Sequence, residues 1–284
     1  MRLIDLIRLV RAPAALSVPG DVVAGAGAAG ALDRRTAALA GASVCLYWAG
    51  MAANDWADRE LDAVERPERP IPSGRVGPGT AVGVAIGLTA AGLTVAGRAA
   101  GSRGLAVAVP LVASIWTYDL LAKNTAAGPA VMATCRALDV LLGACTGDTR
   151  AAAGTAAAIG VHTYTLTALS RREVSGGRPG QAAATLATTA ALAGAIAAGR
   201  AGTPAAPVTR ALAAVYALRY GLAQARIVTD SAAPRVRAAV AAGIVELPTL
   251  QGALASRAGS ARAGLAVATA APLARLLARK VSPT

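Results

Sequence analysis

Apolar stretches of about 20 residues, separated by short loops that contain arginine, recur along almost the whole chain. A helix of that length crosses the hydrocarbon core of a bilayer, and it pairs its own backbone groups there. The pattern therefore predicts an all-α, polytopic membrane bundle. We expect helical spans at approximately 13–32, 36–53, 78–97, 104–122, 127–146, 152–169, 182–199, 206–225, 235–254 and 262–279.

One of the last two apolar runs could instead lie in the interface, so about nine transmembrane helices are expected. Charged residues make up only 15% of the chain, compared with about 25% in soluble domains. We therefore predict a single transmembrane domain over residues 1–284 and a location in the cell membrane.

The net charge of +13 would suggest nucleic acid in a soluble protein. Here the arginines are scattered between apolar runs, so we exclude nucleic acid as a partner. The sequence identifies no particular protein partner. Arginine-rich loops facing anionic lipid explain part of the excess. A polyanionic substrate such as a diphosphate explains the rest.

Two loops are unusually polar, 54–77 and about 170–181. With the N-terminus inside, the loops on their side of the membrane carry more lysine and arginine than the opposite loops through the seventh span. The positive-inside rule therefore predicts that both polar loops face the cytoplasm.

The first polar loop contains the sequence NDWADRELDAVERPERPIPSGR from Asn54 to Arg75. Spacings of three and four residues would place Asp55, Asp58 and Asp62 on one face of a helix. Carboxylate and amide oxygens suit Mg²⁺, which is typically held by one or two carboxylates together with substrate phosphates. Arginines can bind the same phosphates, so this loop predicts a Mg²⁺ and lipid diphosphate site beside an apolar bundle.

The stretch resembles the first motif of the UbiA-type membrane prenyltransferase superfamily, NDxxDxxxD followed by RP-x-RPIPSG. The resemblance implies a helical bundle around a central cavity. It also implies Mg²⁺-dependent transfer of an isoprenoid chain from a prenyl diphosphate to a small, often aromatic, acceptor. The expected partners are a prenyl diphosphate and the lipid bilayer. The matching residues are Asn54, Asp55, Asp58 and Asp62 in the acidic part, and Arg66, Pro67, Arg69, Pro70, Ser73 and Gly74 in the tail.

The same resemblance assigns the remaining site residues. Lys123, after the fourth span, matches a basic residue that meets the diphosphate, although a snorkelling lysine is an equally good interpretation. The second family motif usually carries two or more aspartates, but here its only acid is Glu173, which follows Arg171 and Arg172. In this altered second motif, the chain resembles the divergent EboC-like members of the superfamily.

The resulting hypothesis has three sets of residues. The predicted metal ligands are Asp55, Asp58, Asp62 and Glu173, of which Asp55, Asp58 and Glu173 are also predicted to be catalytic. The predicted substrate-binding residues are Asn54, Arg66, Arg69, Lys123, Arg171 and Arg172.

Two alternatives stay open on the sequence alone. The altered second motif is also consistent with a non-catalytic lipid-binding or transport-linked protein that kept the fold. A small-molecule transporter with an acidic cation site fits less well, because it has no need for the RPxRP arginines.

Within the fifth span, Arg136 and Asp139 could form a structural i, i+3 pair or line the substrate cavity.

Overall fold

The computed structural model describes residues 2–199 and 202–273, and this part of the chain is helical, as predicted. The helices are α1 (Leu3–Leu9), η1 (Ala12–Ser17), α2 (Val18–Ala28), α3 (Arg34–Ala57), α4 (Arg59–Glu65), α5 (Pro78–Thr117), η2 (Tyr118–Ala122), α6 (Gly128–Ala144), α7 (Ala153–Ser170), α8 (Pro179–Ala197), α9 (Ala206–Thr229), α10 (Ala233–Arg257) and α11 (Ala261–Ala268). Helix η1 is a 3₁₀ helix and η2 is a π-helical segment.

The first predicted span, 13–32, is not one continuous helix, so that prediction is wrong. Its place is taken by η1 and the 11-residue α2, which is only about 16 Å long at 1.5 Å per residue. Each of these two helices has a proline in its first turn, where the missing N–H costs nothing. The chain therefore restarts its helix instead of continuing it.

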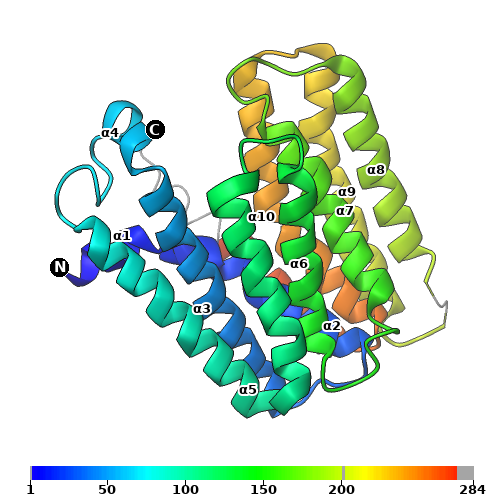
Figure 1. The fold of residues 1–284 in the computed structure, drawn as a ribbon. Helices are drawn as coiled ribbons and strands as arrows, with labels where there is room; N and C mark the ends of the chain where they lie inside the picture. The colour runs from blue at the N-terminus through cyan, green and yellow to red at the C-terminus, as the bar shows by residue number, and fades with distance from the viewer. Residues whose placement is uncertain (1, 200–201, 274–284) are drawn as a thin grey trace.

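Helix α5, continued by η2, contains the third and fourth predicted spans. The two arms meet at Gly101, whose backbone has φ 60° and ψ −142°. Glycine adopts this conformation without a steric penalty, so the chain reverses there, and Figure 1 shows the two arms of α5 meeting at one end of the bundle.

Four helices in the described residues are long and apolar enough to cross a membrane, by length and composition: Arg34–Ala57, Pro78–Ala122, Pro179–Ala197 and Ala233–Arg257. They agree with a multi-pass membrane bundle. The count of about nine spans, and the treatment of residues 1–284 as one domain, stay predictions.

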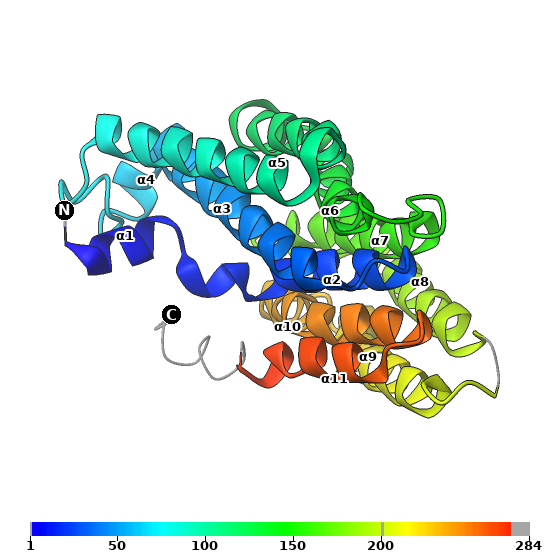
Figure 2. The same cartoon turned by 90° about the horizontal axis from the view of Figure 1, so that it is seen from below.

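The bundle has two large clusters of buried apolar side chains. One includes Leu46 of α3 and Leu111 of α5, and the other includes Ile159 of α7 and Leu250 of α10. Helices α2 and α6 contribute to both clusters, and Figure 2 shows α2 between α3 and α6 on one side and α10 and α11 on the other. These two helices therefore join the two parts of the bundle.

Helices α2 and α6 approach closely because glycines lie at their crossing. A Cβ added to Gly25 would lie 1.9 Å from the carbonyl oxygen of Val140, and one added to Gly143 would lie 2.0 Å from that of Val22. Small residues allow this kind of backbone contact between membrane helices. The crossing places α2 beside the charged residues of α6 described below.

Candidate active site

The acidic motif spans the end of α3, the short helix α4 and the loop that leads to α5. Asp55 lies in α3 and Asp62 lies in α4, but Asp58 lies between the two helices with φ −89° and ψ 3°. The helix is therefore interrupted at Asp58. The expectation of one continuous helical face carrying all three carboxylates is wrong at this residue.

Asp55 and Asp62 share a basic partner. Arg69 Nη1 lies 2.5 Å from Asp62 Oδ2 and 3.5 Å from Asp55 Oδ1, and both carboxylate side chains are only 4% exposed. Asp55 Oδ1 also accepts a 2.5 Å hydrogen bond from Arg11, which precedes η1. The loop after α4 and the N-terminal segment thus converge on Asp55.

Asp58 has a different partner. Lys123 Nζ lies 2.5 Å from Asp58 Oδ1, and the two side chains are 15% and 23% exposed. The lysine follows η2, 65 residues further along the chain. The structure therefore brings Lys123 into direct contact with the acidic motif.

Asn54 connects the motif to the buried side of the bundle. Its Nδ2 donates a 3.3 Å hydrogen bond to Asp119 Oδ1, and its Oδ1 accepts a 3.4 Å bond from Arg11. Asp119 is buried within η2. Neither Arg11 nor Asp119 is among the site residues predicted from the sequence.

An apolar cavity of about 320 Å³ lies at the centre of the bundle. A smaller pocket of about 40 Å³, lined in part by Asp119, shares several lining residues with it. The two spaces are therefore adjacent, and the smaller one ends at the partner of Asn54. Residues that line both are Tyr47, Met51, Tyr118 and Met132.

The charged side chain that lines the central cavity is Arg136 of α6. Its Nε lies 2.7 Å from Asp21 Oδ2, whereas Asp139 accepts a hydrogen bond from Ser43. Gln251 also donates a 2.6 Å bond to Asp21. Arg136 is thus paired with a residue of α2 and not with its i, i+3 neighbour, and it also forms part of the cavity wall.

The second polar loop follows α7. Its Arg171 donates a hydrogen bond to the carbonyl of Thr125, in the loop that also holds Lys123, so the two predicted loops lie at the same end of the bundle. Glu173 is half-buried, and its carbonyl accepts a 2.9 Å bond from Arg237. Burial raises the pKa of the Glu173 carboxyl, and the charge of Arg237 opposes that rise. Arg172 is half-buried in the same turn.

The predicted metal ligands do not form a ready-made cluster. Within residues 2–199 and 202–273, no three His, Cys, Asp or Glu side chains lie close enough together to hold a metal ion. Asp55, Asp58 and Asp62 instead contact basic side chains. The oxygen donors still suit a Mg²⁺ ion held by one or two carboxylates, with substrate phosphates completing its coordination.

Arg66, predicted to bind substrate, is exposed at the end of α4.

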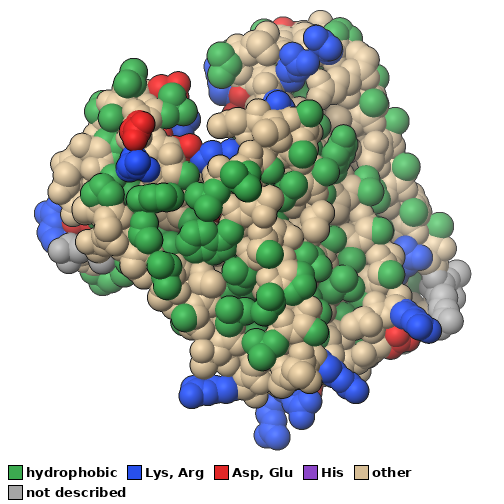
Figure 3. Space-filling view, viewed as in Figure 1, with side chains coloured by type: hydrophobic (Ala, Val, Ile, Leu, Met, Phe, Trp, Pro, Cys, Tyr) green, Lys and Arg blue, Asp and Glu red, His purple; other side chains and the backbone are tan. Residues whose placement is uncertain are grey.

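The surface around the motif is hollowed. Figure 3 shows a notch between the surface over α4 and the surface over the ends of α8, α9 and α10, with acidic and basic side chains at its edge. Such a mixed edge can bind a metal and a phosphate at the same place.

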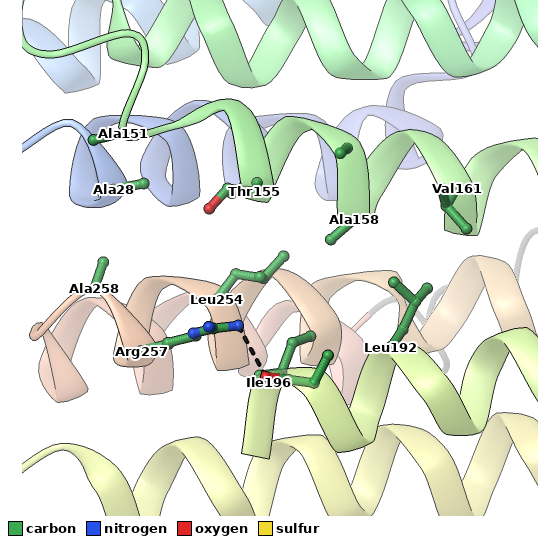
Figure 4. Close-up of a pocket in the computed structure, with 13 residues that line it drawn as sticks. Ala28, Ala151, Thr155, Ala158, Val161, Leu192, Ile196, Leu254, Arg257 and Ala258 are labelled. Atoms are coloured by element: carbon green, nitrogen blue, oxygen red, sulfur yellow. Dashed lines mark hydrogen bonds between the residues drawn. The ribbon is translucent and has the colours of Figure 1, made fainter. Parts of the chain in front are cut away.

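A second groove, of about 460 Å³, lies between α7, α8 and α10 and is shown in Figure 4. It lies beside the start of α7, whereas the central cavity reaches Ser170 at the end of that helix. Its charged lining residue is Arg257, which donates a 3.0 Å hydrogen bond to the carbonyl of Ala195. Alanine is the most frequent residue of the lining, and Thr155 and Arg257 are its only side chains with polar groups, so this groove offers little for chemistry.

The fold and this site together define a multi-pass helical membrane protein with a charged motif next to an apolar cavity. Residues 15–174 match the UbiA prenyltransferase family, and the chain belongs to that family.

Two of the matching relatives are named as synthases. The chain is 41% identical over 86 residues to digeranylgeranylglyceryl phosphate synthase of Ignicoccus hospitalis. This aligned stretch covers 30% of this chain and 28% of the relative. The chain is 43% identical over 84 residues to the bacteriochlorophyll synthase 33 kDa chain of Rhodobacter capsulatus, covering 29% and 26%. The aligned stretches thus span just over a quarter of these relatives.

The likeness of fold extends much further than the likeness of sequence. The apo structure of a UbiA homologue from Aeropyrum pernix K1 superimposes with a TM-score of 0.66 at 19% identity, covering 84% of this chain and 96% of that one. The helical architecture of the family therefore continues through the second half of the chain.

Proposed function

We propose that this protein is an integral-membrane prenyltransferase that moves an isoprenoid chain from a prenyl diphosphate to a small acceptor. The observation that supports this most directly is the hydrogen bond of 3.3 Å between Asn54 and Asp119. It joins a charged motif suited to a diphosphate to a pocket that adjoins an apolar cavity suited to a hydrocarbon tail. The names of the relatives agree with this class of reaction.

The diphosphate would lie at the acidic motif. Mg²⁺, when bound, would neutralise the negative charge that develops on the departing diphosphate. Its ligands would be drawn from Asn54, Asp55, Asp58 and Asp62, with Glu173 as a ligand from the second loop. Arg69 and Lys123, which now pair with the carboxylates, would exchange them for phosphate oxygens. Arg66, Arg171 and Arg172 would add positive charge around the same group.

The isoprenoid chain would enter the central cavity. Side chains such as Trp48, Leu166 and Leu247 line that cavity and would exclude water from the reacting carbon. Exclusion of water matters because an allylic cation reacts with water as readily as with an acceptor. The acceptor would reach the same carbon within this cavity.

The protein would have a defined orientation in the membrane. The motif loops would face the cytoplasm, which follows from the distribution of basic residues among the loops. The donor, a prenyl diphosphate, would then approach from the cytoplasmic leaflet of the bilayer.

The test is pyrophosphate release by the purified protein in lipid nanodiscs, with prenyl diphosphates of several lengths and a mixture of cell-extract acceptors. The wild type should release pyrophosphate only when Mg²⁺ is present. Asp55→Asn, Asp58→Asn and Glu173→Gln should each lower the rate by about 100-fold or more. Glu65→Gln, at an exposed acid of the same loop, is the matched control and should leave the rate unchanged.

Binding measurements separate this proposal from the alternative of a non-catalytic lipid-binding protein. Wild-type protein that binds prenyl diphosphate but never releases pyrophosphate, with any acceptor, would refute the enzyme and support the alternative. Neutralising Arg171 and Arg172 together should weaken diphosphate binding, and unchanged binding would remove these arginines from the site.

A further inference from the structure

A groove of about 530 Å³ runs between α9 and α10, on a part of the molecule that the proposed reaction does not use. None of the residues that line it also lines the central cavity. Its lining combines arginines with alanine and other apolar residues, among them Arg219, Leu222 and Arg226 of α9 and Arg235, Ala242 and Val245 of α10.

Basic side chains predominate in this groove. Arg219, Arg226 and Arg235 are all exposed. Two acids lie close to them. The buried Glu246 has Oε1 3.8 Å from Arg219 Nη1, and Asp230 has Oδ2 3.0 Å from Arg235 Nε in a pair that is 51% exposed on both sides. Three cations and two acids leave the groove with an excess of positive charge.

The groove begins at the same end of the bundle as the candidate active site. Arg226 is in the last turn of α9, and Arg235 is in the first turn of α10. The connection between these helices contacts the second polar loop, because the backbone N–H of Gly177 donates to the carbonyl of Ser231. The two arginines therefore lie at the level where membrane helices meet lipid headgroups.

The rest of the groove extends toward the middle of the bundle. Arg219 lies seven residues before Arg226, which is about 10 Å along the helix axis. Beside it, Leu218 and Leu222 are 61% and 52% exposed. Residues 206–225 of α9 are predicted from the sequence to span the membrane, and large exposed apolar side chains on such a span would face the lipid chains. The groove would then open toward lipid.

We propose that this groove binds a phospholipid with an anionic headgroup. The phosphate and the headgroup charge would contact Arg226 and Arg235, which can donate several hydrogen bonds to one phosphate. An acyl chain would lie along the alanine-lined part between α9 and α10.

The test is native mass spectrometry of the full-length protein released from vesicles that contain equal amounts of phosphatidylglycerol and phosphatidylcholine. The wild type should retain phosphatidylglycerol over phosphatidylcholine by about tenfold or more. R226Q/R235Q should reduce that preference to less than about twofold, whereas R226K/R235K, which keeps the charge, should preserve most of it.

The matched control is R98Q/R103Q. It removes the same charge from two exposed arginines that flank the Gly101 kink in α5, and it should leave the preference intact. The single variant R226Q, expected to lower the preference severalfold, replaces the double variant if that one does not fold. Equal retention of the two lipids by the wild type would overturn the proposal. An unchanged preference in R226Q/R235Q, or an equal loss in R98Q/R103Q, would do the same.

Discussion

Arg11 donates a hydrogen bond of 2.5 Å to Asp55, a residue 44 positions further along the chain. Arg11 itself has φ 45° and ψ 52°, in the left-handed region that non-glycine residues seldom occupy. Such strain persists only where the surrounding structure imposes it, and it is concentrated at functional sites. The turn after α1 thus directs a cation onto the carboxylate that we propose as a metal ligand.

Replacing Arg11 should therefore make Asp55 more available to Mg²⁺. In Arg11→Gln the competing cation is gone, and we expect the half-saturating Mg²⁺ concentration to fall by about tenfold, which corresponds to the lower end of the energy of one charged hydrogen bond. The measurement is a Mg²⁺ titration of pyrophosphate release. Arg8→Gln, at an exposed arginine of α1, should leave the titration unchanged. A higher Mg²⁺ requirement in Arg11→Gln would contradict the competition.

Arg69 should be important for stability because it pairs with two carboxylates that are only 4% exposed. Arg69→Ala leaves Asp62 without this partner, and breaking a buried pair costs about 3–5 kcal/mol. The exposed Arg66 of the same loop provides the comparison, and Arg66→Ala should cost less than about 0.5 kcal/mol. Thermal unfolding in detergent measures both. Equal losses of stability in the two variants would show that the Arg69 pairs contribute little.

The pair formed by Arg136 and Asp21 should show strong coupling, because its side chains are 6% and 0% exposed. Asp21→Asn should destabilise the protein by about 3–5 kcal/mol, since it leaves a buried guanidinium without its counter-charge. The double variant Asp21→Leu with Arg136→Met should be more stable than Asp21→Asn. A double-mutant cycle that compares the single variants Asp21→Leu and Arg136→Met with their double variant measures the coupling. Additive effects on the free energy of unfolding would mean that the two side chains act independently.

The crossing of α2 and α6 should not accept a methyl group at Gly143. The added Cβ would lie 2.0 Å from the Val22 carbonyl oxygen, so the helices must move apart, at a cost of about 1–3 kcal/mol. Gly87→Ala in α5 is the control, because a Cβ there has no neighbour within 4 Å. In a helix it should be neutral or stabilising by up to about 1 kcal/mol. A fall in unfolding temperature that is the same in both variants would argue against close packing at Gly143.

The apolar runs predicted most of the helices because hydropathy is a property of consecutive residues. The predicted range 206–225 lies within α9, and 235–254 lies within α10. The range 13–32 was wrong because a proline in the first turn of each of its two helices divides it, an effect that mean hydropathy does not register. Residues 262–279 reach beyond Leu273, so the last predicted span lies partly outside the described residues.

The sequence predicted the candidate site only in part, because local patterns do not show which distant residues pack together. The motif from Asn54 to Arg75 predicted the carboxylates, and the family resemblance predicted that Lys123 belongs to the same site. The local spacing of Arg136 and Asp139 suggested a pair, but the structure pairs Arg136 with Asp21, 115 residues away by their numbers. No local pattern distinguishes these outcomes, because both leave the arginine buried beside an acid.

The sequence by itself therefore determined the helical membrane architecture, the family motif and the types of residue that can bind a diphosphate. The tertiary structure alone decided the partners of those residues: Arg11 and Arg69 for Asp55, Lys123 for Asp58 and Asp119 for Asn54. Hydropathy and periodicity act between near neighbours in the chain, so they can be recognised locally. The pairing of charges depends on which helix ends pack together, and that packing depends on contacts along the entire bundle.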